Sequence, residues 1–384
     1  MSDPKIERIR AAYERDMREQ PKARKAGDIP ISYEAITPEW MTALLCKDTP
    51  GAEVTEIRLG EPDSGTSNRR RIFLSYNAAG QAAGLPKSVF CKAAHALSNR
   101  LLLSSAATLS ETIFFNKARA MLDIDAPEAY LADYDPESWA SIVVMKDIGD
   151  EVEFCSHETP MDQASVRSQL DLLARLHGKF FESPLFDSEL SDVPTFQFRF
   201  RNLVNKHGLQ KCCEDGVDAS EAITPARLFA RRAEIWPATV RAVDRFDVLP
   251  VTYTHNDVHL KNWYIRDRPK MGLGDWQVVC RGHWSRDVAY TISTALTPEN
   301  RRAWERDLVK FYLDRLHAEG GPKLPFDEAW LDYREQMLTA LAWWTMTLTP
   351  SPEMPDMQPQ DTTIEFIRRI IIAVDDLESL DVAR

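Results

Sequence analysis

The first 45 residues carry two helical patterns. Asp3 and Pro4 supply an N-cap and a proline at the first helical position, and the apolar residues that follow recur at helical spacing: Ile6, Ile9, Tyr13 and Met17. A second, shorter pattern covers residues 36–45. Both patterns predict helices that bury one apolar stripe and expose a charged face.

Between residues 54 and 89 the pattern changes to short alternating runs. VTEIRL, RRIFLSY and KSVFCKA are rich in β-branched and aromatic residues and are separated by Gly, Pro, Asp and Asn, which predicts three antiparallel strands. Residues 104–123 then predict one helix, with these residues along its apolar side: Leu109, Ile113, Phe114, Ala118 and Met121. Residues 140–150 predict one more buried strand that ends in a polar turn.

The remainder of the chain is mostly helical in pattern. Helical periodicity covers residues 165–181, 225–241 and 300–316, whereas residues 252–279 predict short strands and loops. His177 lies in the first of these helices, where a buried core histidine is the ordinary outcome. The sequence therefore predicts an α+β chain with two lobes: a sheet-rich N-terminal lobe and a larger helical C-terminal lobe.

Composition narrows the classes of partner. The chain has 384 residues, of which 47 are basic and 59 acidic, and its formal charge of −12 has the wrong sign for nucleic-acid binding. No apolar run approaches the roughly 18 residues of a membrane span, and the first residues carry charges where a secretory signal would be apolar. The six cysteines show no disulfide or zinc-ribbon spacing. A cytoplasmic protein with a small neutral or cationic partner is predicted.

The stretch THNDVHLKNWYI, residues 254–265, concentrates the candidate chemistry. Zinc hydrolases place two histidines four residues apart on a helix with a glutamate between them. His255 and His259 have this spacing, but Asn256 stands at the glutamate position and the neighbouring residues favour strand and loop. In phosphoryl transfer, a carboxylate orients the attacking hydroxyl, and a carboxamide five residues later helps to hold magnesium. Asp257 and Asn262 have that spacing, and Asp275 follows within a short hairpin as a second magnesium ligand.

These residues carry a family resemblance. HNDVHLKN resembles the H-G-D-x-H-x-x-N loop of the aminoglycoside phosphotransferase-like kinases, a superfamily that includes choline kinases and ecdysteroid-kinase-like proteins. The similarity to that superfamily extends to both sides of this loop. Downstream it continues into GDWQVVCRGHWSRDVAY, and upstream it includes, in the expected order, LPKSVFCKAA, SETIFFNKA, VVMKDIG and LARLHGKFF. The resemblance covers roughly residues 40–345. It implies a bilobal protein-kinase-like fold, with residues 1–145 as the nucleotide-binding lobe and 146–384 as the catalytic lobe.

The resemblance also implies an activity, the transfer of the ATP γ-phosphoryl group to a hydroxyl group of a small molecule with Mg²⁺. Asp257 would be the catalytic aspartate, and Asn262 and Asp275 would bind the metal. His255 would brace the catalytic loop, whereas His259 would either support the loop or bind the substrate side. Asp287, in SRDVAY, resembles the buried aspartate that ties the backbone of this loop together.

The nucleotide site implied by the resemblance lies in the first lobe. Lys92, at the end of a predicted strand, would contact the α- and β-phosphates, with Glu111 on the next helix as its partner. The phosphate loop departs from G-x-G-x-x-G, because only Gly60 and Gly65 are present. A glycine turn with hydroxyl donors would serve instead: Gly65 with Ser64, Thr66 and Ser67. Arg69, Arg70 and Arg71 would add positive charge.

The segment from Met145 to Ile148, which includes Asp147, would be the hinge that binds adenine through its backbone. Lys146 stands there in place of the acidic residue of many relatives. This residue and the unusual glycine turn leave open a nucleotide-binding, pseudokinase-like regulator. Nucleotidyl transfer on the same fold also stays open, because it would use the same residues. The acceptor also stays open between a hydroxylated lipid, sterol or xenobiotic and an aminoglycoside or choline. The aromatic residues of the last helices would pack in the core or wall the acceptor cleft: Trp330, Tyr333, Trp343 and Trp344.

Overall fold

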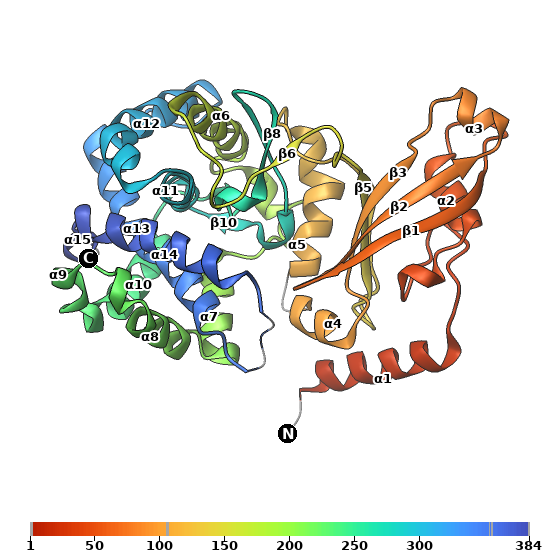
Figure 1. Ribbon diagram of the computed structural model, residues 1–384, viewed down its shortest axis with the longest axis horizontal. Helices are drawn as coiled ribbons and strands as arrows, with labels where there is room; N and C mark the ends of the chain where they lie inside the picture. Colours follow the sequence, from red (N-terminus) through yellow and green to blue (C-terminus); the bar gives the residue numbers. More distant parts are fainter. Residues whose placement is uncertain (1–2, 105–106, 353, 355, 383–384) are drawn as a thin grey trace. The chain divides into compact units, whose positions relative to one another are not determined.

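The computed structural model of the protein describes residues 3–104, 107–352, 354 and 356–382, and the chain divides into two compact units (Figure 1). Unit 1 consists of Met1–Arg119 and Pro127–Glu151. Unit 2 consists of Ala120–Ala126 and Val152–Arg384. The first unit contains the large sheet and the second is mainly helical, which confirms the predicted α+β fold class.

Unit 1 is built on a five-stranded antiparallel sheet in the order β1-β2-β3-β5-β4. Its strands are β1 (Val54–Ser64), β2 (Asn68–Tyr76), β3 (Ser88–Ala93), β4 (Ala129–Tyr134) and β5 (Ser141–Lys146). Three of these strands were predicted from the alternating runs, and β5 was predicted as a further buried strand. The pattern missed β4, an edge strand whose burial is incomplete, with Tyr130 37% exposed.

Alternate residues of the sheet face two apolar clusters. Ile142 and Val144 of β5 join Trp40 and Met41 of helix α2 (Pro38–Leu45) in one cluster. Val143, the residue between them, joins Met145 and Ala132 in the second cluster. Because successive side chains of a strand point to opposite faces, this central strand is buried on both sides. Strand β5, which leads to the predicted hinge, is thereby held firmly inside the sheet.

The helices of unit 1 are α1 (Pro4–Glu19), α2, α3 (Ala78–Ala82), α4 (Leu97–Leu103) and α5 (Ala107–Ile113). The first two occur where the sequence predicts helices, and the side chain of the predicted N-cap, Asp3, caps α1; α3 and α4 were not predicted. The single helix expected over residues 104–123 is wrong: α5 gives way to a π-helix over Phe114–Ala118 and a 3-10 turn over Arg119–Met121. The wider π turn changes the angle between successive side chains. Phe114 and Ala118 remain buried, but Met121 is 39% exposed rather than part of the apolar side.

Unit 2 packs its helices around α11. The helices are α6 (Gln163–Lys179), α7 (Phe196–His207), α8 (Leu209–Ala219), α9 (Ala226–Phe229), α10 (Ile235–Asp244), α11 (Trp284–Ala295), α12 (Pro298–Ala318), α13 (Phe326–Leu348), α14 (Gln360–Asp376) and α15 (Ser379–Val382). Every residue of α11 is buried. The helix contacts α6, α12, α13 and α14, which lie around it in Figure 1. The polar residues of α11 must therefore find partners inside the protein.

Short strands between α10 and α11 confirm the pattern read from residues 252–279. β7 (Thr252–Thr254) pairs with β10 (Cys280–Gly282), and β6 (Glu153–Phe154), β8 (Trp263–Asp267) and β9 (Lys270–Leu273) form a three-stranded sheet. β8 and β9 are an antiparallel hairpin in which Trp263 lies opposite Leu273. The residue before β8 and the residues after β9 are consequently at the same end of the hairpin.

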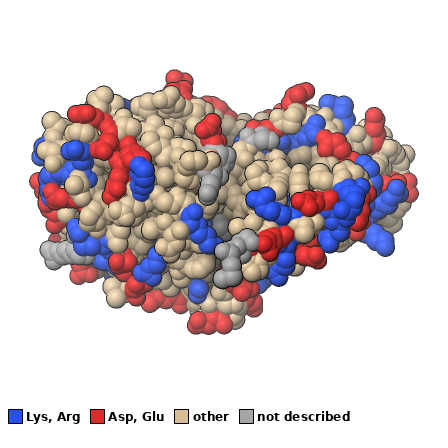
Figure 2. Space-filling model, turned by 90° about the horizontal axis from the view of Figure 1, so that it is seen from below, with Lys and Arg blue, Asp and Glu red and all other residues tan. Residues whose placement is uncertain are grey.

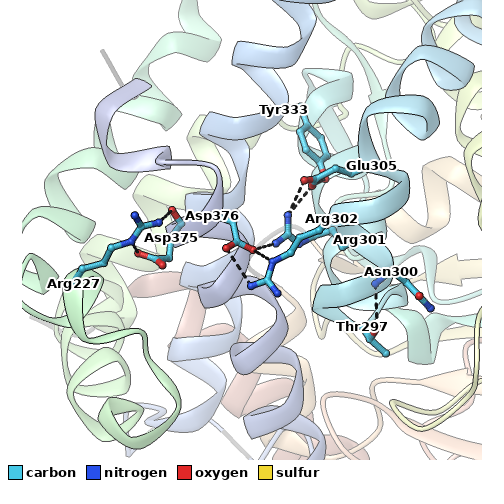
Figure 3. A network of polar contacts seen from close by, with 9 residues as sticks. All are labelled: Arg227, Thr297, Asn300, Arg301, Arg302, Glu305, Tyr333, Asp375 and Asp376. Atoms are coloured by element: carbon cyan, nitrogen blue, oxygen red, sulfur yellow. Dashed lines mark hydrogen bonds and ion pairs between the residues drawn. The ribbon is translucent and has the colours of Figure 1, made fainter.

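A buried ionic network joins α12 to α13 and α14 (Figure 3). Arg301, 1% exposed, donates to both carboxylate oxygens of Glu305 at 2.8 and 2.9 Å and also binds Asp376. Tyr333 donates to Glu305 at 3.1 Å. Asp376 ends α14, where the helix dipole disfavours an acidic side chain, so the arginines offset an otherwise unfavourable charge. The network fixes the end of α14 against α12.

Surface charges of opposite sign lie side by side on the face in Figure 2. In unit 1, for example, Arg70 pairs with Glu34 at 2.6 Å. All six cysteines are buried and free. Among the described residues, no helix combines the length and the apolar character needed to cross a bilayer.

Candidate active site

The catalytic loop predicted from the sequence connects β7 to β8. Thr254, His255 and Asn256 are buried, and Asn256 has a left-handed φ of 72°. A non-glycine residue in this region is strained unless its surroundings hold it. The chain leaves the strand through this turn, so the conformation of Asn256 decides where the next side chain, Asp257, points.

Asp287 on α11 holds the backbone of this loop. Its Oδ2 accepts from the backbone N–H of His255 at 2.7 Å, and its Oδ1 accepts from the backbone N–H of Asn256 at 2.9 Å. His177 of α6 contacts the same carboxylate at 3.2 Å, and Tyr312 contacts the other ring nitrogen at 2.7 Å. The prediction that Asp287 ties the loop together and that His177 is a core residue is confirmed.

The His255 ring braces the loop through both of its nitrogens. Nδ1 accepts from the backbone N–H of Asp257 at 3.2 Å, so Nε2 carries the proton and donates to the carbonyl of Gly274 at 2.8 Å. Burial lowers the pKa of His255, which outweighs the nearby Asp287 and Asp257. The ring is therefore neutral. Neither nitrogen is left for a zinc ion.

Three side chains contact the Asp257 carboxylate, which is 20% exposed. Tyr290 lies 3.3 Å from Oδ1, and Asn262 Nδ2 lies 3.2 Å from Oδ2. His259 Nε2 is 3.6 Å from Oδ2. Burial acts to raise the pKa of Asp257, but His259, His255 and the Tyr290 hydroxyl together lower it below its ordinary value. The carboxylate is ionised and can accept a hydrogen bond from a hydroxyl group.

Asn262 and Asp275 lie at the same end of the β8–β9 hairpin. The backbone N–H of Gly274 donates to the carbonyl of Asn262 at 2.8 Å. Asn262 Nδ2 also donates to the Asp257 carbonyl at 2.7 Å, so its amide nitrogen faces the loop. Asp275 follows Gly274 in a left-handed conformation with φ 57°. The hairpin thus brings together the two sequence-predicted metal ligands.

An amide oxygen and a carboxylate fit Mg²⁺, which takes oxygen ligands and keeps several of its positions for water and phosphate. Among the residues that the structure describes, no group of three or more His, Cys, Asp and Glu side chains is placed to hold a metal ion. A magnesium site of one amide and one carboxylate is not a group of that kind. Asn262 and Asp275 therefore fit the predicted cation.

Two residues of α11 that contact the loop were missed in the sequence. Arg286, 1% exposed, donates to the side-chain oxygen of Asn256 and, at 3.3 Å, to its carbonyl. Its guanidinium lies over the rings of Phe196 (4.6 Å) and Trp343 (4.7 Å). Tyr290 contacts Asp257, as described above. Tyr290 is three residues after Asp287 and four residues after Arg286, and this helical spacing in SRDVAY was the signal that could have found them.

Two of the four aromatic residues predicted for the core or the acceptor cleft, Tyr333 and Trp344, are buried inside unit 2. Trp344 is 2% exposed and lies 5.2 Å from the His259 ring, and Tyr333 is fully buried beside Trp330 at 5.1 Å. Trp343 is only partly buried. Trp344 therefore packs against the catalytic loop through the His259 ring.

Unit 1 contains the predicted lysine–glutamate pair. Lys92 Nζ on β3 lies 2.9 Å from Glu111 Oε1 on α5, and the two side chains are only 7% and 10% exposed. A buried ion pair keeps its geometry because separating it leaves charges that water cannot reach. The ammonium of Lys92 is held in place at the end of its strand.

The predicted phosphate turn connects β1 to β2. The backbone N–H of Gly65 donates to the carbonyl of Ser67 at 3.0 Å, and the amide of Asn99 on α4 donates to the carbonyls of Gly65 (3.0 Å) and Thr66 (2.8 Å). The side chain of Ser64 lies outside the described residues. Asn99, which the sequence did not single out, thus holds the backbone of a turn that lacks the glycines of G-x-G-x-x-G.

The three arginines after this turn already have carboxylate partners. Arg69 lies 2.9 Å from Asp63. Arg70 pairs with Glu34, and Arg71 pairs with Asp147 and, at 2.7 Å, with Asp150. Their positive charge is therefore offset within unit 1.

The predicted hinge begins at Met145, which lies between Phe90 of β3 and Ala129 of β4. The carboxylate of Asp147 accepts from Ser88 at 2.6 Å and from the backbone N–H of Gly149 at 3.0 Å. The carbonyl of Ile148 accepts from the backbone N–H of Glu151 at 2.9 Å. The Asp147 side chain thus stabilises a turn, and the binding of adenine by the backbone of this segment stays a prediction.

A pocket of about 340 Å³ lies between α8, α10 and α13. Its walls include Val217, Trp236 and Leu341, with Asp218 and Arg232 also in the lining. None of its lining residues belongs to the catalytic loop or to the β8–β9 hairpin.

Comparison with known proteins was made on sequence and on structure. The sequence profile of the phosphotransferase enzyme family matches residues 103–332, more than half of the chain. No curated protein matches the sequence of this chain. A presumed aminoglycoside phosphotransferase from Ralstonia eutropha is similar over 89% of this chain and 97% of its own, with 14% identity and a TM-score of 0.51, which shows a shared fold. Macrolide 2'-phosphotransferase from Brachybacterium faecium is similar over 80% and 91%, with 14% identity and a TM-score of 0.48.

Proposed function

The chain belongs to the phosphotransferase enzyme family, and we propose that it transfers the γ-phosphoryl group of ATP to a hydroxyl group of a small molecule with Mg²⁺ bound. The observation that carries the proposal is the arrangement around Asp257. The residue is ionised, partly exposed and held by Asn262, whose backbone carbonyl accepts from the residue before Asp275. In-line phosphoryl transfer requires a carboxylate that orients the acceptor hydroxyl close to oxygen ligands for a metal ion.

In the proposed reaction Asp257 accepts a hydrogen bond from the acceptor hydroxyl and orients its oxygen toward the γ-phosphorus. The new oxygen–phosphorus bond forms as the bond between the γ-phosphorus and the bridging oxygen breaks, ADP leaves with that bond's electron pair, and the hydroxyl proton passes to the carboxylate. His255 and Asp287 fix the loop that carries Asp257 and do not touch the reacting atoms.

Asn262 and Asp275 would hold Mg²⁺, which when bound offsets negative charge on the phosphate oxygens. In unit 1, Lys92 would contact the α- and β-phosphates, with Glu111 keeping the ammonium in position. The Gly65–Ser67 turn would offer backbone and hydroxyl donors to phosphate, and the backbone from Met145 to Ile148 would bind adenine.

For the acceptor, the formal charge of −12 favours a neutral or cationic molecule over an anionic one. A hydroxylated apolar molecule and an aminoglycoside or choline-like cation both satisfy this condition. The enzyme class is the same for either acceptor, because both present an alcohol oxygen to phosphorus.

The test is Asp257→Asn, which keeps the shape of the side chain and removes its negative charge. With ATP, Mg²⁺ and a panel of alcohols and amino-alcohols, the variant should release ADP at least about a hundredfold more slowly than the wild type, with nucleotide affinity nearly unchanged. Asp381→Asn is the matched control, because this exposed carboxylate pairs only with Arg231 at the surface. Equal turnover of Asp257→Asn and wild type would refute the assignment.

Two alternatives predict other outcomes in the same assay. A pseudokinase-like regulator would show nucleotide-dependent thermal stabilisation without ADP release, and the motive for it is Lys146, which pairs with Glu151 at 3.2 Å. Nucleotidyl transfer would release pyrophosphate and add the mass of AMP to the acceptor. Mass spectrometry of the product separates it from phosphoryl transfer.

A further inference from the structure

Helix α11 presents three side chains to the catalytic loop, and each holds a different part of it. Arg286 binds the side chain and carbonyl of Asn256, and Asp287 binds two backbone N–H groups. Tyr290, three residues after Asp287, contacts the carboxylate of Asp257. Residues three apart on a helix face the same side. The helix that anchors the loop backbone thus also reaches its reactive side chain.

We propose that Tyr290 is a positioning residue that donates its phenol proton to Asp257 Oδ1 and fixes the orientation of the carboxylate toward the acceptor hydroxyl. The inference rests on the proposed function, in which Asp257 orients that hydroxyl.

The direction of the Tyr290 hydrogen bond follows from its environment. The phenol O–H donates to Asp257 Oδ1 at 3.3 Å. Burial raises the pKa of Tyr290, and the Asp257 carboxylate adds to the rise, so the phenol keeps its proton at neutral pH. The ring is 1% exposed and lies beside the His259 ring (6.3 Å) and the Arg286 guanidinium (5.5 Å).

The other contacts of Asp257 do not replace Tyr290. Asn262 and His259 both approach Oδ2, at 3.2 and 3.6 Å, whereas Tyr290 is the side chain placed at Oδ1. Without the phenol, the carboxylate is held on one oxygen and can rotate about its Cβ–Cγ bond, whose rotational wells are broad. Small changes in the orientation of a catalytic group reduce turnover strongly without changing substrate affinity to the same degree.

Tyr290→Phe removes one oxygen and keeps the packed ring. Tyr333→Phe is the matched control, because this buried tyrosine also donates to a buried carboxylate, Glu305 Oε2 at 3.1 Å, in the network of Figure 3. ADP release is measured with ATP, Mg²⁺ and the best alcohol of the acceptor panel, or with water as acceptor if no alcohol raises the rate. Thermal unfolding is recorded for both variants.

Tyr290→Phe should lower kcat by about tenfold to a hundredfold and leave the KM for ATP within about twofold. Tyr333→Phe should keep kcat within about twofold of the wild type, although its melting temperature should fall by about as much as that of Tyr290→Phe. In a double variant with Asp257→Asn, the loss of the Tyr290 hydroxyl should cause no further decrease, because both changes remove the same function.

An unchanged kcat in Tyr290→Phe, with an active wild type, would overturn the role of Tyr290 and leave the proposed function intact. A further drop in the double variant would overturn it as well, because the phenol would then act independently of Asp257. A kcat loss matched by Tyr333→Phe would mean that Tyr290 contributes only to folding. A wild type that releases no ADP with any acceptor, water included, would overturn the proposed function and this inference with it.

Discussion

Asp287→Asn tests whether α11 holds the catalytic loop as the structure indicates. The Asp287 side chain is fully buried and accepts from the backbone N–H groups of His255 (2.7 Å) and Asn256 (2.9 Å). An asparagine has one acceptor oxygen, so its NH₂ group must face one of these two donors. One buried N–H group loses its partner, and the other hydrogen bond loses its charged acceptor.

The size of the effect follows from these two hydrogen bonds. Loss of a bond to a charged acceptor costs about 1.5–3 kcal/mol, and conversion of the second bond to a neutral one costs about 1 kcal/mol more. We therefore expect the free energy of unfolding of unit 2 to fall by about 2.5–4 kcal/mol at pH 7. Turnover should fall as well, because Asn256 determines where Asp257 points.

The effect should depend on pH with a definite sign. Burial acts to raise the pKa of Asp287, but the hydrogen bond and charge of His177, together with His255 and Arg286, lower it below the ordinary 3.8. A carboxyl group with a lowered pKa contributes stability that is fully present above its unfolded pKa and is lost as the pH falls through the folded pKa. The difference between wild type and Asp287→Asn should therefore be constant above about pH 4 and shrink below it.

Urea unfolding followed by tryptophan fluorescence measures the difference, because several tryptophans lie in unit 2 close to the loop, among them Trp276 and Trp284. Asp381→Asn serves as control and should change little, since its carboxylate pairs with Arg231 at the surface. A destabilisation below about 1 kcal/mol for Asp287→Asn, or one that does not shrink on acidification, would refute the reasoning.

Two further substitutions test the packing of each unit. Lys92→Met should destabilise unit 1 by about 3–5 kcal/mol in urea unfolding, because it removes the ammonium beside a buried carboxylate. The double variant Lys92→Met with Glu111→Leu should regain most of that stability. Additive losses in the double variant would contradict this prediction. Gly216→Ala should destabilise unit 2 by about 1–3 kcal/mol despite the better helix propensity of alanine, because the new Cβ would lie 2.3 Å from the backbone oxygen of Thr345. Gly27→Ala, with no atom within 4 Å of its Cβ, is the control for differential scanning calorimetry, and equal melting temperatures for the two alanine variants would contradict the prediction.

Much of the fold and the enzyme class was predictable from local patterns. The capped helix after Asp3, the three alternating strands and the helix around His177 occur where the spacing of apolar residues predicts them. The family match confirms the predicted superfamily and the prediction of a phosphotransferase. The roles of Asp257, Asn262 and Asp275 stay predictions, although the structure brings the first two into contact.

Where local spacing carries no information, the sequence prediction was wrong or silent. The π-helix after Ile113 follows a segment with ordinary helical periodicity, and β4 is an edge strand with too little burial to leave a strong alternating pattern. The Asn99 clamp on the β1–β2 turn joins residues more than thirty positions apart. Such contacts depend on how elements pack after they form.

The sequence by itself determined most of the elements and the spacing of Asp257, Asn262 and Asp275, because helical and strand periods, caps and turns are properties of neighbouring residues. Only the tertiary structure decided which groups hold Asp257. Arg286, Asp287 and Tyr290 are about thirty residues from the loop they contact. They reach it because α11 is buried on all sides and its polar groups must find partners within the protein.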